Sequence, residues 1–420
     1  MKFIVSIELD GKFRKVGEIS GTNYTDARFQ YDEDYLSDGN TRAISISLPK
    51  KEAPFSFKET EVFFDGLLPE AYTRRFLAER FHVDVNDYVS LLHLLGSECL
   101  GALRIADETD VYEEHYTKIS EKEVRELASE GISKSMDMVT KSRLSLTGAT
   151  GKTGLYFDEK TNTWFLPKGC APSTHIVKQS HVRLDGIVTN EQLSLLTAAK
   201  CGIDVPASFI INVGNGNDSD ILFATKRYDR TYNKNGIFVD GLPKPERLHQ
   251  EDFAQAMGIS SIHKYEANNE CYLRKMFETI RNNSFNPLED QLKLWDRIIF
   301  NCLIGNADFH IKNFSLIYSP EMKRISLAPA YDIVSTVIYD SSSKELPFRI
   351  GDAKLIDKIT EKDFESACDE IGFNKKTAMK KFNSIHEKFE KALDEAGTEL
   401  KESGFHKAVE IAERIKTYVN

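Results

Sequence analysis

A polar stretch in the second half of this chain limits what the chain can fold into and do. In residues 306–314 (Asn-Ala-Asp-Phe-His-Ile-Lys-Asn-Phe), Asp308 stands five residues before Asn313, and Asp332 follows in the sequence Pro-Ala-Tyr-Asp-Ile. An aspartate, an asparagine five residues later and a distal aspartate are the side chains with which kinases orient an acceptor hydroxyl and hold magnesium. Their oxygens suit a hard cation such as Mg2+. Two solvated turn residues would give the same spacing. The sequence upstream is therefore needed to distinguish a kinase site from a solvated turn.

The upstream sequence supplies two further motifs of the same chemistry. Residues 145–154 are rich in glycine and hydroxyl side chains, so backbone N–H groups there can approach phosphate oxygens, and Lys152 adds a positive charge. Leu146 stands where a Walker A loop needs glycine, and a glycine-rich hairpin is the alternative. Strand-like residues 174–178 end in Lys178, as does the kinase strand that presents lysine to nucleotide phosphates. The four motifs follow one another in the order that a kinase uses.

Length, charge and cysteines narrow the class of protein. A chain of 420 residues with 41% hydrophobic and 29% charged residues is expected to form two or three globular units. It has no apolar run of membrane-spanning length and no signal-peptide pattern, so we expect a cytoplasmic protein without membrane contact. The net charge of -10 disfavours broad nucleic-acid binding by this chain alone. Six scattered cysteines indicate neither a zinc site nor a disulfide framework.

The pattern of elements predicts an α+β protein with a two-lobed, protein-kinase-like fold. An N-terminal α/β subdomain, a connector, a nucleotide-binding lobe and a mainly helical catalytic lobe are expected at residues 1–108, 109–141, 142–245 and 246–420. Strands are expected at 4–7 and 15–19 around the turn pair Asp10-Gly11, and at 43–48, 174–178, 207–212 and 220–224. Helices are expected at 71–81, 89–95, 190–200 with Thr189 as cap, 249–258, 288–303, 361–371, 375–396 and 405–418, and one after the capping box of Ser120 and Glu123.

After the strand at 220–224 comes a segment that takes the place of a kinase hinge. In this segment Tyr228 could cover an adenine ring and Asp229 could accept hydrogen bonds from ribose hydroxyls. Together these motifs resemble those of the HipA-type serine/threonine kinases of bacterial toxin-antitoxin modules. The resemblance covers nearly the full length and rests on residues 63–70, 96–101, 166–169, 174–178, 226–230, 249–258, 305–314 and 331–336.

The resemblance implies a role for each matching residue. Asp308 would be the catalytic aspartate, Asn313 and Asp332 the magnesium ligands, and Lys178 the lysine that contacts ATP phosphates. The remaining nucleotide-binding residues would be Thr147, Gly148, Ala149, Thr150, Gly151 and Lys152 in the phosphate loop, Lys226, Arg227, Tyr228 and Asp229 in the hinge, and His310 and Tyr331. Ser145 would be an autophosphorylation site that ejects the phosphate loop and silences the kinase; a neighbouring threonine is the alternative. Lys226 departs from the family pattern, in which glutamate is familiar.

The resemblance also implies partners and a substrate class. The partner would be a small helix-turn-helix antitoxin, similar to HipB, through which the kinase meets DNA indirectly; no basic run at 351–362 supports direct contact. The expected substrate is a protein, with an aminoacyl-tRNA synthetase such as glutamyl-tRNA synthetase as the familiar case, whose phosphorylation halts translation and growth. The alternatives are a small-molecule phosphotransferase of the aminoglycoside-kinase kind and an inactive module that bridges antitoxins.

Overall fold

The chain folds into two compact units, each built from three separate segments. The computed structural model describes residues 1–96, 99–107, 113–142, 151–181, 183–232, 236–267 and 270–419, with residue 419 described by its backbone only. The first unit consists of Met1–Gln179, Ala224–Ser261 and Ile317–Ile325, and the second of Ser180–Phe223, Ile262–Leu316 and Ser326–Asn420. The four consecutive parts expected from the sequence divide the chain differently and stay a prediction.

A four-stranded sheet opens the first unit. Its order is β3-β2-β1-β4. The strands are β1 (Lys2–Leu9), β2 (Lys12–Ser20), β3 (Arg28–Tyr31) and β4 (Leu103–Ala106). β1 and β2 form an antiparallel hairpin, and left-handed φ angles of 49° at Asp10 and 72° at Gly11 make its tight turn. The hairpin expected around this turn pair is confirmed.

Four helices accompany this sheet. They are α1 (Glu33–Ser37), α2 (Phe57–Asp65), α3 (Ala71–Phe81) and α4 (Tyr88–Leu95). Ser56 and Glu59 form a capping box that fixes the start of α2, which packs against β3 and α4. The two helices expected at 71–81 and 89–95 are confirmed as α3 and α4.

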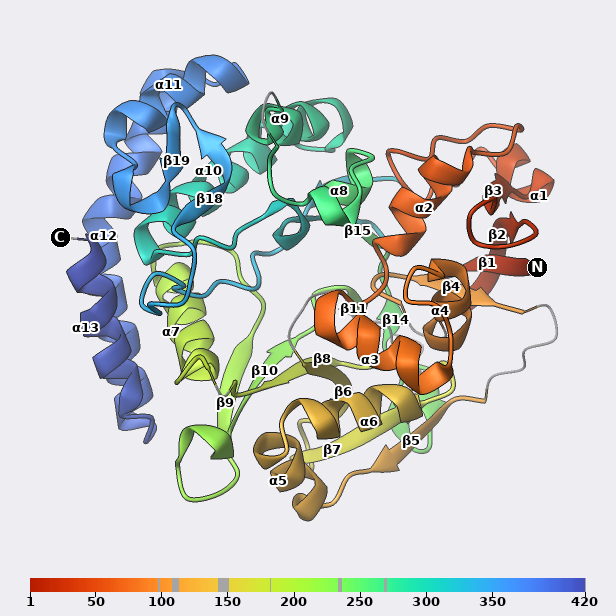
Figure 1. Cartoon of the computed structure of the whole chain (residues 1–420), viewed down its shortest axis with the longest axis horizontal. Coiled ribbons are helices and arrows are strands. Elements are labelled where there is room, and N and C mark those ends of the chain that lie inside the picture. The colour runs from red at the N-terminus through yellow and green to blue at the C-terminus, as the bar shows by residue number, and fades with distance from the viewer. Residues whose placement is uncertain are drawn as a thin grey trace. The chain divides into compact units, whose positions relative to one another are not determined.

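A second antiparallel sheet in the first unit carries the predicted strand lysine. Its strands β5 (His115–Lys118), β7 (Thr163–Lys168), β6 (Lys152–Asp158) and β8 (His175–Gln179) are neighbours in that order. The helices α5 (Glu121–Ser129) and α6 (Ile132–Ser142) precede β6 in the chain, and α6 lies over β6 and β7 (Figure 1). The expected capping box of Ser120 and Glu123 starts α5 and is confirmed.

The remaining strands and turns are short. Two-residue pairs are formed by β11 (Arg230–Thr231) with β14 (Glu246–Arg247) and by β12 (Phe238–Val239) with β13 (Leu242–Pro243). Further short elements are β15 (Gln250–Asp252), α8 (Phe253–Ala256), β9 (Ser208–Asn212), β10 (Ile221–Lys226), β16 (Ser315–Tyr318), β17 (Ile325–Leu327), β18 (Glu345–Ile350), β19 (Ala353–Leu355), and the 3-10 turns η1 (Asp218–Asp220), η2 (Ser261–His263), η3 (Ile311–Asn313) and η4 (Ile356–Lys358). The strands expected at 174–178, 207–212 and 220–224 are confirmed as β8, β9 and β10.

Helices dominate the second unit. They are α7 (Ile187–Lys200), α9 (Tyr272–Asn283), α10 (Pro287–Ile304), α11 (Glu361–Ile371), α12 (Lys375–Glu402) and α13 (Lys407–Val419). The long helix α12 packs against α7, α10 and α11, and Figure 1 shows it running beside α13. Trp295 of α10 is fully buried, and its indole N–H donates to the carbonyl of Ala378 on α12 at 3.1 Å. The helix expected at 288–303 is thus confirmed, and it packs in the core of this unit.

The strand expected at 43–48 does not form. Ser45 and Leu48 instead make an isolated bridge across a turn. Side chains satisfy the polar groups of this segment: Glu251 accepts from the Ser45 hydroxyl at 2.5 Å and from the Ile46 N–H at 3.1 Å, and the Tyr31 hydroxyl donates to the Leu48 carbonyl at 2.6 Å. Because these partners come from distant segments, an alternating pattern alone could not reveal them.

Two helix starts also differ from the prediction. Thr189 lies inside α7, which begins at Ile187 because Gly186, with a φ of 73°, takes the left-handed cap position and Val188 is buried. The helix expected at 249–258 begins only at Phe253. The Asp252 carboxylate accepts from the Gln255 N–H at 2.8 Å and caps it there.

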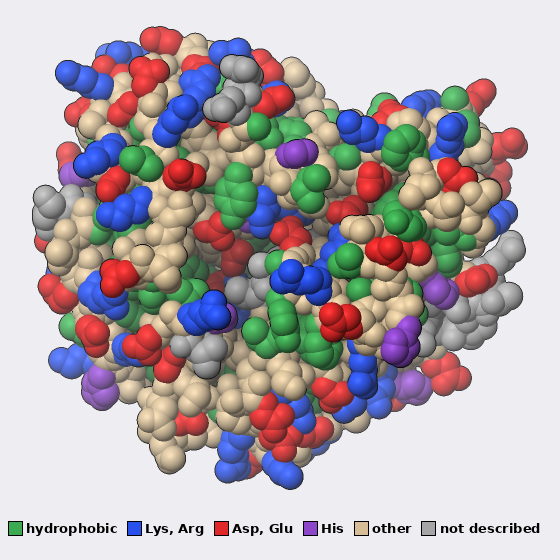
Figure 2. All heavy atoms as spheres, in the orientation of Figure 1, with side chains coloured by type: hydrophobic (Ala, Val, Ile, Leu, Met, Phe, Trp, Pro, Cys, Tyr) green, Lys and Arg blue, Asp and Glu red, His purple; other side chains and the backbone are tan. Residues whose placement is uncertain are grey.

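The surface carries both signs of charge. On the face shown in Figure 2, Lys and Arg side chains are interspersed with Asp and Glu and form no continuous basic stripe.

In the described part of the chain, none of the helices combines the length and the apolar character that crossing a membrane requires.

Candidate active site

The loop 306–314 begins where α10 is forced to end. Gly305 caps this helix with a φ of 73°, a left-handed conformation that favours glycine. A Cβ atom at this position would lie 2.3 Å from a methyl carbon of Val337, which is too close for any other residue. The helix end therefore fixes the direction in which the loop leaves.

Hydrogen bonds hold the first residues of the loop. The Asn306 side-chain amide donates to the Asn301 side-chain oxygen at 2.7 Å, and the Asn306 amide oxygen accepts from the Asp308 N–H at 3.0 Å. The Ala307 N–H donates to the Thr336 hydroxyl at 2.7 Å. The backbone just before the predicted catalytic aspartate is thus held both by α10 and by the segment that follows Asp332.

The loop presents the Asp308 side chain while it buries its neighbours. Asp308 is exposed, whereas Phe309, His310 and Ile311 are buried. The side-chain amide of Asn313 donates to the Asp308 backbone carbonyl at 2.8 Å, so the two predicted site residues are in direct contact. This bond uses the amide nitrogen of Asn313, and its amide oxygen is the atom that could serve a metal ion. A carboxylate on an anchored backbone is what positioning an acceptor hydroxyl requires.

The segment that carries Asp332 is attached to this loop. The Tyr331 hydroxyl lies 2.6 Å from the Ser315 hydroxyl and donates to the Lys312 carbonyl at 3.1 Å. Asp332 is half-buried and has a φ of 57°, which is rare for a residue with a side chain and is found mostly where function or a turn requires it. The structure therefore brings together the predicted residues Asp308, His310, Asn313, Tyr331 and Asp332 within the second unit.

The helix α7 holds the other end of this segment. The Asn190 side chain donates to the Ser335 carbonyl at 2.9 Å and accepts from the Ser335 N–H at 3.0 Å. Asn190 is fully buried, and so is Ser335. The sequence pattern places Asn190 at a helix start and does not reveal this role, because its partner lies 145 residues away in the sequence.

The predicted phosphate-binding lysines lie in the first unit, on two paired strands. Lys152 of β6 stands directly opposite Lys178 of β8 in the antiparallel register. Directly opposite residues share a face of the sheet, so the side chains of these two lysines extend from the same face. At Gly151 a Cβ atom would lie 2.3 Å from the Gln179 amide nitrogen, so a side chain at this position would have to displace that of Gln179. The predicted residues Ser145, Thr147, Gly148, Ala149 and Thr150 lie outside the described residues.

The predicted hinge residues Arg227 and Asp229 form a buried ion pair. Arg227 donates to the two carboxylate oxygens of Asp229 at 2.9 and 2.7 Å, Arg230 lies 3.0 Å from the same group, and the Gly101 N–H donates to it at 3.0 Å. Burial alone would raise the pKa of Asp229, but the two guanidinium groups outweigh it and hold the pKa below its ordinary value. These contacts give both side chains a structural role, and their contact with a nucleotide stays a prediction.

The other two hinge residues also have side-chain partners. The Lys226 ammonium lies 2.9 Å from a carboxylate oxygen of Glu159 in an exposed ion pair, and the Tyr228 hydroxyl donates to the side-chain oxygen of Gln250. Contact of Lys226 and Tyr228 with a nucleotide stays a prediction.

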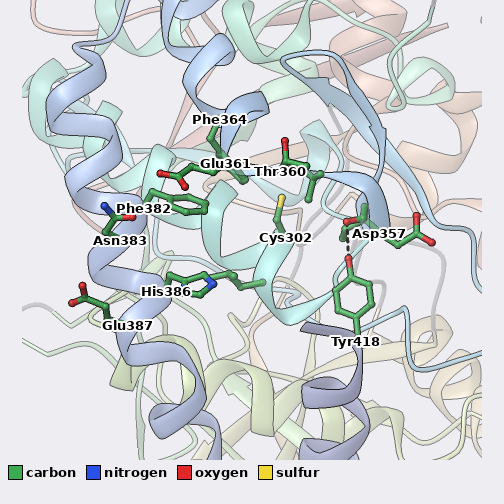
Figure 3. Close-up of a pocket in the computed structure, with 13 residues that line it drawn as sticks. Cys302, Asp357, Thr360, Glu361, Phe364, Phe382, Asn383, His386, Glu387 and Tyr418 are labelled. Atoms are coloured by element: carbon green, nitrogen blue, oxygen red, sulfur yellow. Dashed lines mark hydrogen bonds between the residues drawn. The ribbon is translucent and has the colours of Figure 1, made fainter. Parts of the chain in front are cut away.

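A cavity of about 650 Å3 in the second unit is separate from this site. Cys302 of α10, Phe364 of α11, Phe382 and His386 of α12 and Tyr418 of α13 line it (Figure 3). The Tyr418 hydroxyl donates to the Ile356 carbonyl at 2.7 Å at its wall. The lining of this cavity includes none of Asp308, Asn313 and Asp332. The cavity is therefore not part of the predicted site.

One contact of the site was not expected from the sequence. The Tyr265 hydroxyl donates to a carboxylate oxygen of Asp308 at 2.6 Å. The two residues are 43 positions apart, and the surrounding sequence carries no motif that would have indicated the contact.

Two family models match this chain. The HipA-like C-terminal domain matches residues 144–393, and the HipA N-terminal domain matches residues 8–106. The first range contains the described site residues, and the second contains helices α1 to α4 and the strands β2, β3 and β4 of the opening sheet.

Comparisons with individual proteins agree with the two family models. The chain is 34% identical over 83% of its length to "Putative kinase Y4mE" of Sinorhizobium fredii, of which 81% is covered. It is 25% identical over 80% of its length to the serine/threonine-protein kinase toxin HipA of Shewanella oneidensis, of which 76% is covered. A solved structure of HipA with HipB and operator DNA, from the same organism, superposes with a TM-score of 0.80, 21% identity and coverage of 99% of this chain and 96% of that one. The α+β, kinase-like fold predicted from the sequence is thereby confirmed.

Proposed function

Because this chain belongs to the HipA family, we propose that it is an ATP-dependent serine/threonine protein kinase that acts as the toxin of a toxin-antitoxin module. Asp308 accepts the proton of the acceptor hydroxyl or orients that hydroxyl. Asn313 and Asp332 hold magnesium, and Lys178 contacts the phosphates of ATP. Lys152, His310, Tyr331 and the hinge residues make the further nucleotide contacts that the resemblance implies.

The observation that carries this proposal is the anchored arrangement of Asp308, Asn313 and Asp332. Asn313 binds the Asp308 backbone directly, and Tyr331 ties the segment of Asp332 to the same loop. One carboxylate and one amide oxygen make a hard but incomplete ligand set, which suits an ion that takes its remaining ligands from phosphates and water. Magnesium bound with ATP would neutralise phosphate charge there. The paired lysines at 152 and 178 supply positive charge of the kind that phosphates require.

Partners and regulation belong to the same proposal. A helix-turn-helix antitoxin would neutralise this chain and link it to operator DNA, by analogy with the Shewanella oneidensis complex of HipA, HipB and operator DNA. The net charge of -10 fits an indirect rather than a direct DNA contact. The substrate would be a cellular protein, with an aminoacyl-tRNA synthetase such as glutamyl-tRNA synthetase as the family precedent. Autophosphorylation of Ser145 would add negative charge beside the phosphate loop and switch the kinase off.

The test uses radiolabelled ATP and a bacterial lysate. Incubation of the purified protein with labelled Mg-ATP should transfer label to a defined protein band, which mass spectrometry identifies, and Asp308→Asn should leave that band unlabelled. Mapping of phosphate in the toxin itself should find it at Ser145 in the wild type and nowhere in Asp308→Asn. Label appearing only in small molecules would favour a small-molecule phosphotransferase, and no transfer at all would favour an inactive antitoxin-bridging module.

A further inference from the structure

The Tyr265 side chain lies against the predicted catalytic residue. Its hydroxyl donates to a carboxylate oxygen of Asp308 at 2.6 Å, the short distance expected of a hydrogen bond to an anion. Its ring stands edge-on to the His310 ring, with 5.4 Å between the ring centroids. Tyr265 is 48% exposed, so an apolar core does not hold this side chain in place. The contact with Asp308 lies at the surface, where an acceptor protein has access.

The backbone around Tyr265 is anchored on both sides. The Glu266 N–H donates to the Pro347 carbonyl at 2.7 Å, and the Glu266 carboxylate accepts from the Tyr272 N–H at 2.7 Å at the start of α9. The Tyr272 hydroxyl donates to the His263 carbonyl at 2.7 Å. These bonds tie the residues on both sides of Tyr265 to α9 and β18. Tyr265 therefore reaches Asp308 by a side-chain rotamer and not by the movement of a loose loop.

The chemistry of this contact is that of an acceptor. In the proposed reaction the hydroxyl of a substrate serine or threonine donates to the Asp308 carboxylate before its oxygen bonds to the γ-phosphorus and the bond from phosphorus to the bridging oxygen of ADP breaks. The Tyr265 hydroxyl makes that same bond from within the chain. Two hydroxyl groups cannot occupy one position, so an acceptor that uses this oxygen of Asp308 must first displace the tyrosine.

We infer that Tyr265 guards the acceptor position: its hydroxyl occupies the Asp308 carboxylate in the resting protein, and an acceptor hydroxyl exchanges with it. The inference rests on the proposed role of Asp308. Because only the side chain has to rotate while Glu266 stays anchored, the exchange costs little for an acceptor that contacts the protein elsewhere. Water makes no such contacts, and it is therefore the acceptor that Tyr265 excludes best. Tyr265 would thus favour protein substrates over wasteful hydrolysis of ATP.

The first experiment measures hydrolysis of Mg-ATP by the whole chain without a protein substrate. In this reaction a water oxygen bonds to the γ-phosphorus, the bond from phosphorus to the bridging oxygen of ADP breaks, and the water proton leaves through Asp308. Tyr265→Phe should raise kcat for hydrolysis about 3- to 10-fold without changing KM for ATP, because it removes only the competing hydroxyl. The matched control is Tyr72→Phe, which alters a tyrosine of α3 that is 52% exposed and should leave hydrolysis unchanged.

The results separate this inference from the proposed function. If Tyr265→Phe hydrolyses ATP at the wild-type rate or more slowly, Tyr265 does not guard the site, and a lower kcat would assign it to holding Asp308 in place. Asp308→Asn must abolish hydrolysis in the same assay; if it does not, the proposed role of Asp308 fails first, and the inference fails with it.

A second measurement needs no nucleotide. 3-Fluorotyrosine placed at position 265 reports the ionisation of its phenol by 19F NMR. A hydrogen bond to the Asp308 carboxylate favours the neutral phenol, so its pKa should be higher beside Asp308 than in the Asp308→Asn variant. Equal titration curves in the two proteins would show that the contact does not form in solution and would overturn the inference.

Discussion

Glu251 and Asp308 both stand in segments on which the family resemblance rests, 249–258 and 305–314, but their surroundings are opposite. Glu251 is 1% exposed, and its oxygens accept hydrogen bonds from the Ser45 hydroxyl, the Ile46 N–H and the Tyr318 hydroxyl. Asp308 is exposed on a loop whose backbone is anchored. A carboxylate that accepts several hydrogen bonds from its own chain thus stabilises the fold, whereas one that faces solvent from a fixed backbone can take part in catalysis.

His249 strengthens the structural side of this comparison. It is buried beside Tyr318, its ring contacts the Ile44 carbonyl at 2.6 Å, and burial lowers its pKa to about 4. Burial also raises the pKa of Glu251 to about 7. Residues 249–252 therefore connect distant parts of the first unit and contribute to its stability.

The largest expected effect is on catalysis. Asp308→Asn keeps the size of the side chain and removes its basicity, so the rate of phosphoryl transfer should fall about 100- to 10,000-fold. ATP affinity should stay within a few-fold, because many groups share ATP binding, whereas Asp332→Ala should weaken binding of Mg-ATP itself. Single-turnover transfer and nucleotide titrations measure the two quantities. Transfer by Asp308→Asn at a near wild-type rate would show that the Asp308 carboxylate does not act in phosphoryl transfer.

Glu251→Ala should act on stability instead. It leaves the Ser45 hydroxyl, the Ile46 N–H and the Tyr318 hydroxyl buried without their acceptor, so the free energy of unfolding should fall by about 3 to 4 kcal/mol. Glu79→Ala, at an exposed position of α3, is the matched control and should change it by less than about 0.5 kcal/mol. Denaturant unfolding checks both, and equal stability of the two variants would remove the structural role of Glu251.

The pH dependence of stability should show the same carboxyl. The folded protein keeps the Glu251 proton up to about pH 7, whereas the unfolded chain loses it near the ordinary value of 4.5, so this group lowers the free energy of unfolding as pH rises between these values. His249, with its lowered pKa, raises the free energy of unfolding as pH rises between about 4 and 6.5. The effect of His249 therefore opposes that of Glu251. Glu251→Gln cannot titrate. The stability of the wild type relative to Glu251→Gln should therefore fall by about 3 kcal/mol from pH 4.5 to 7.5.

Thermal unfolding of both proteins across this pH range makes the measurement. Parallel pH profiles for the wild type and Glu251→Gln would show that Glu251 titrates alike in the folded and unfolded chains. Its buried position would then not hold in solution.

The smallest expected effect tests the start of the catalytic loop. Gly305→Ala forces a left-handed residue and a contact at 2.3 Å with Val337, so it should cost about 2 to 3 kcal/mol of stability. Gly202→Ala is the matched control: Gly202 follows the end of α7 with a φ of 89°, but nothing lies within 4 Å of its Cβ position, so only about 1 kcal/mol is expected. Chemical denaturation compares the two, and equal costs would show that Val337 moves aside.

The sequence by itself determined the elements whose signals are local. Helix α10, the capping box of Ser120 and Glu123, and the Asp10-Gly11 hairpin depend on residues a few positions apart, so propensity and capping were enough to predict them. The spacing from Asp308 to Asn313 is equally local, and their contact through the Asp308 carbonyl follows from it.

Tertiary structure decided what depends on distant partners. Residues 43–48 became a turn because Glu251, about 200 positions away, accepts their hydrogen bonds, and Asp229 became part of an ion pair when Arg227, Arg230 and Gly101 surrounded it. Tyr265 met Asp308 because α9 and β18 anchor the segment that carries it. Such contacts leave no periodic or spacing signal in the sequence. Packing alone decides whether a carboxylate finds donors in the interior or remains at the surface for an acceptor.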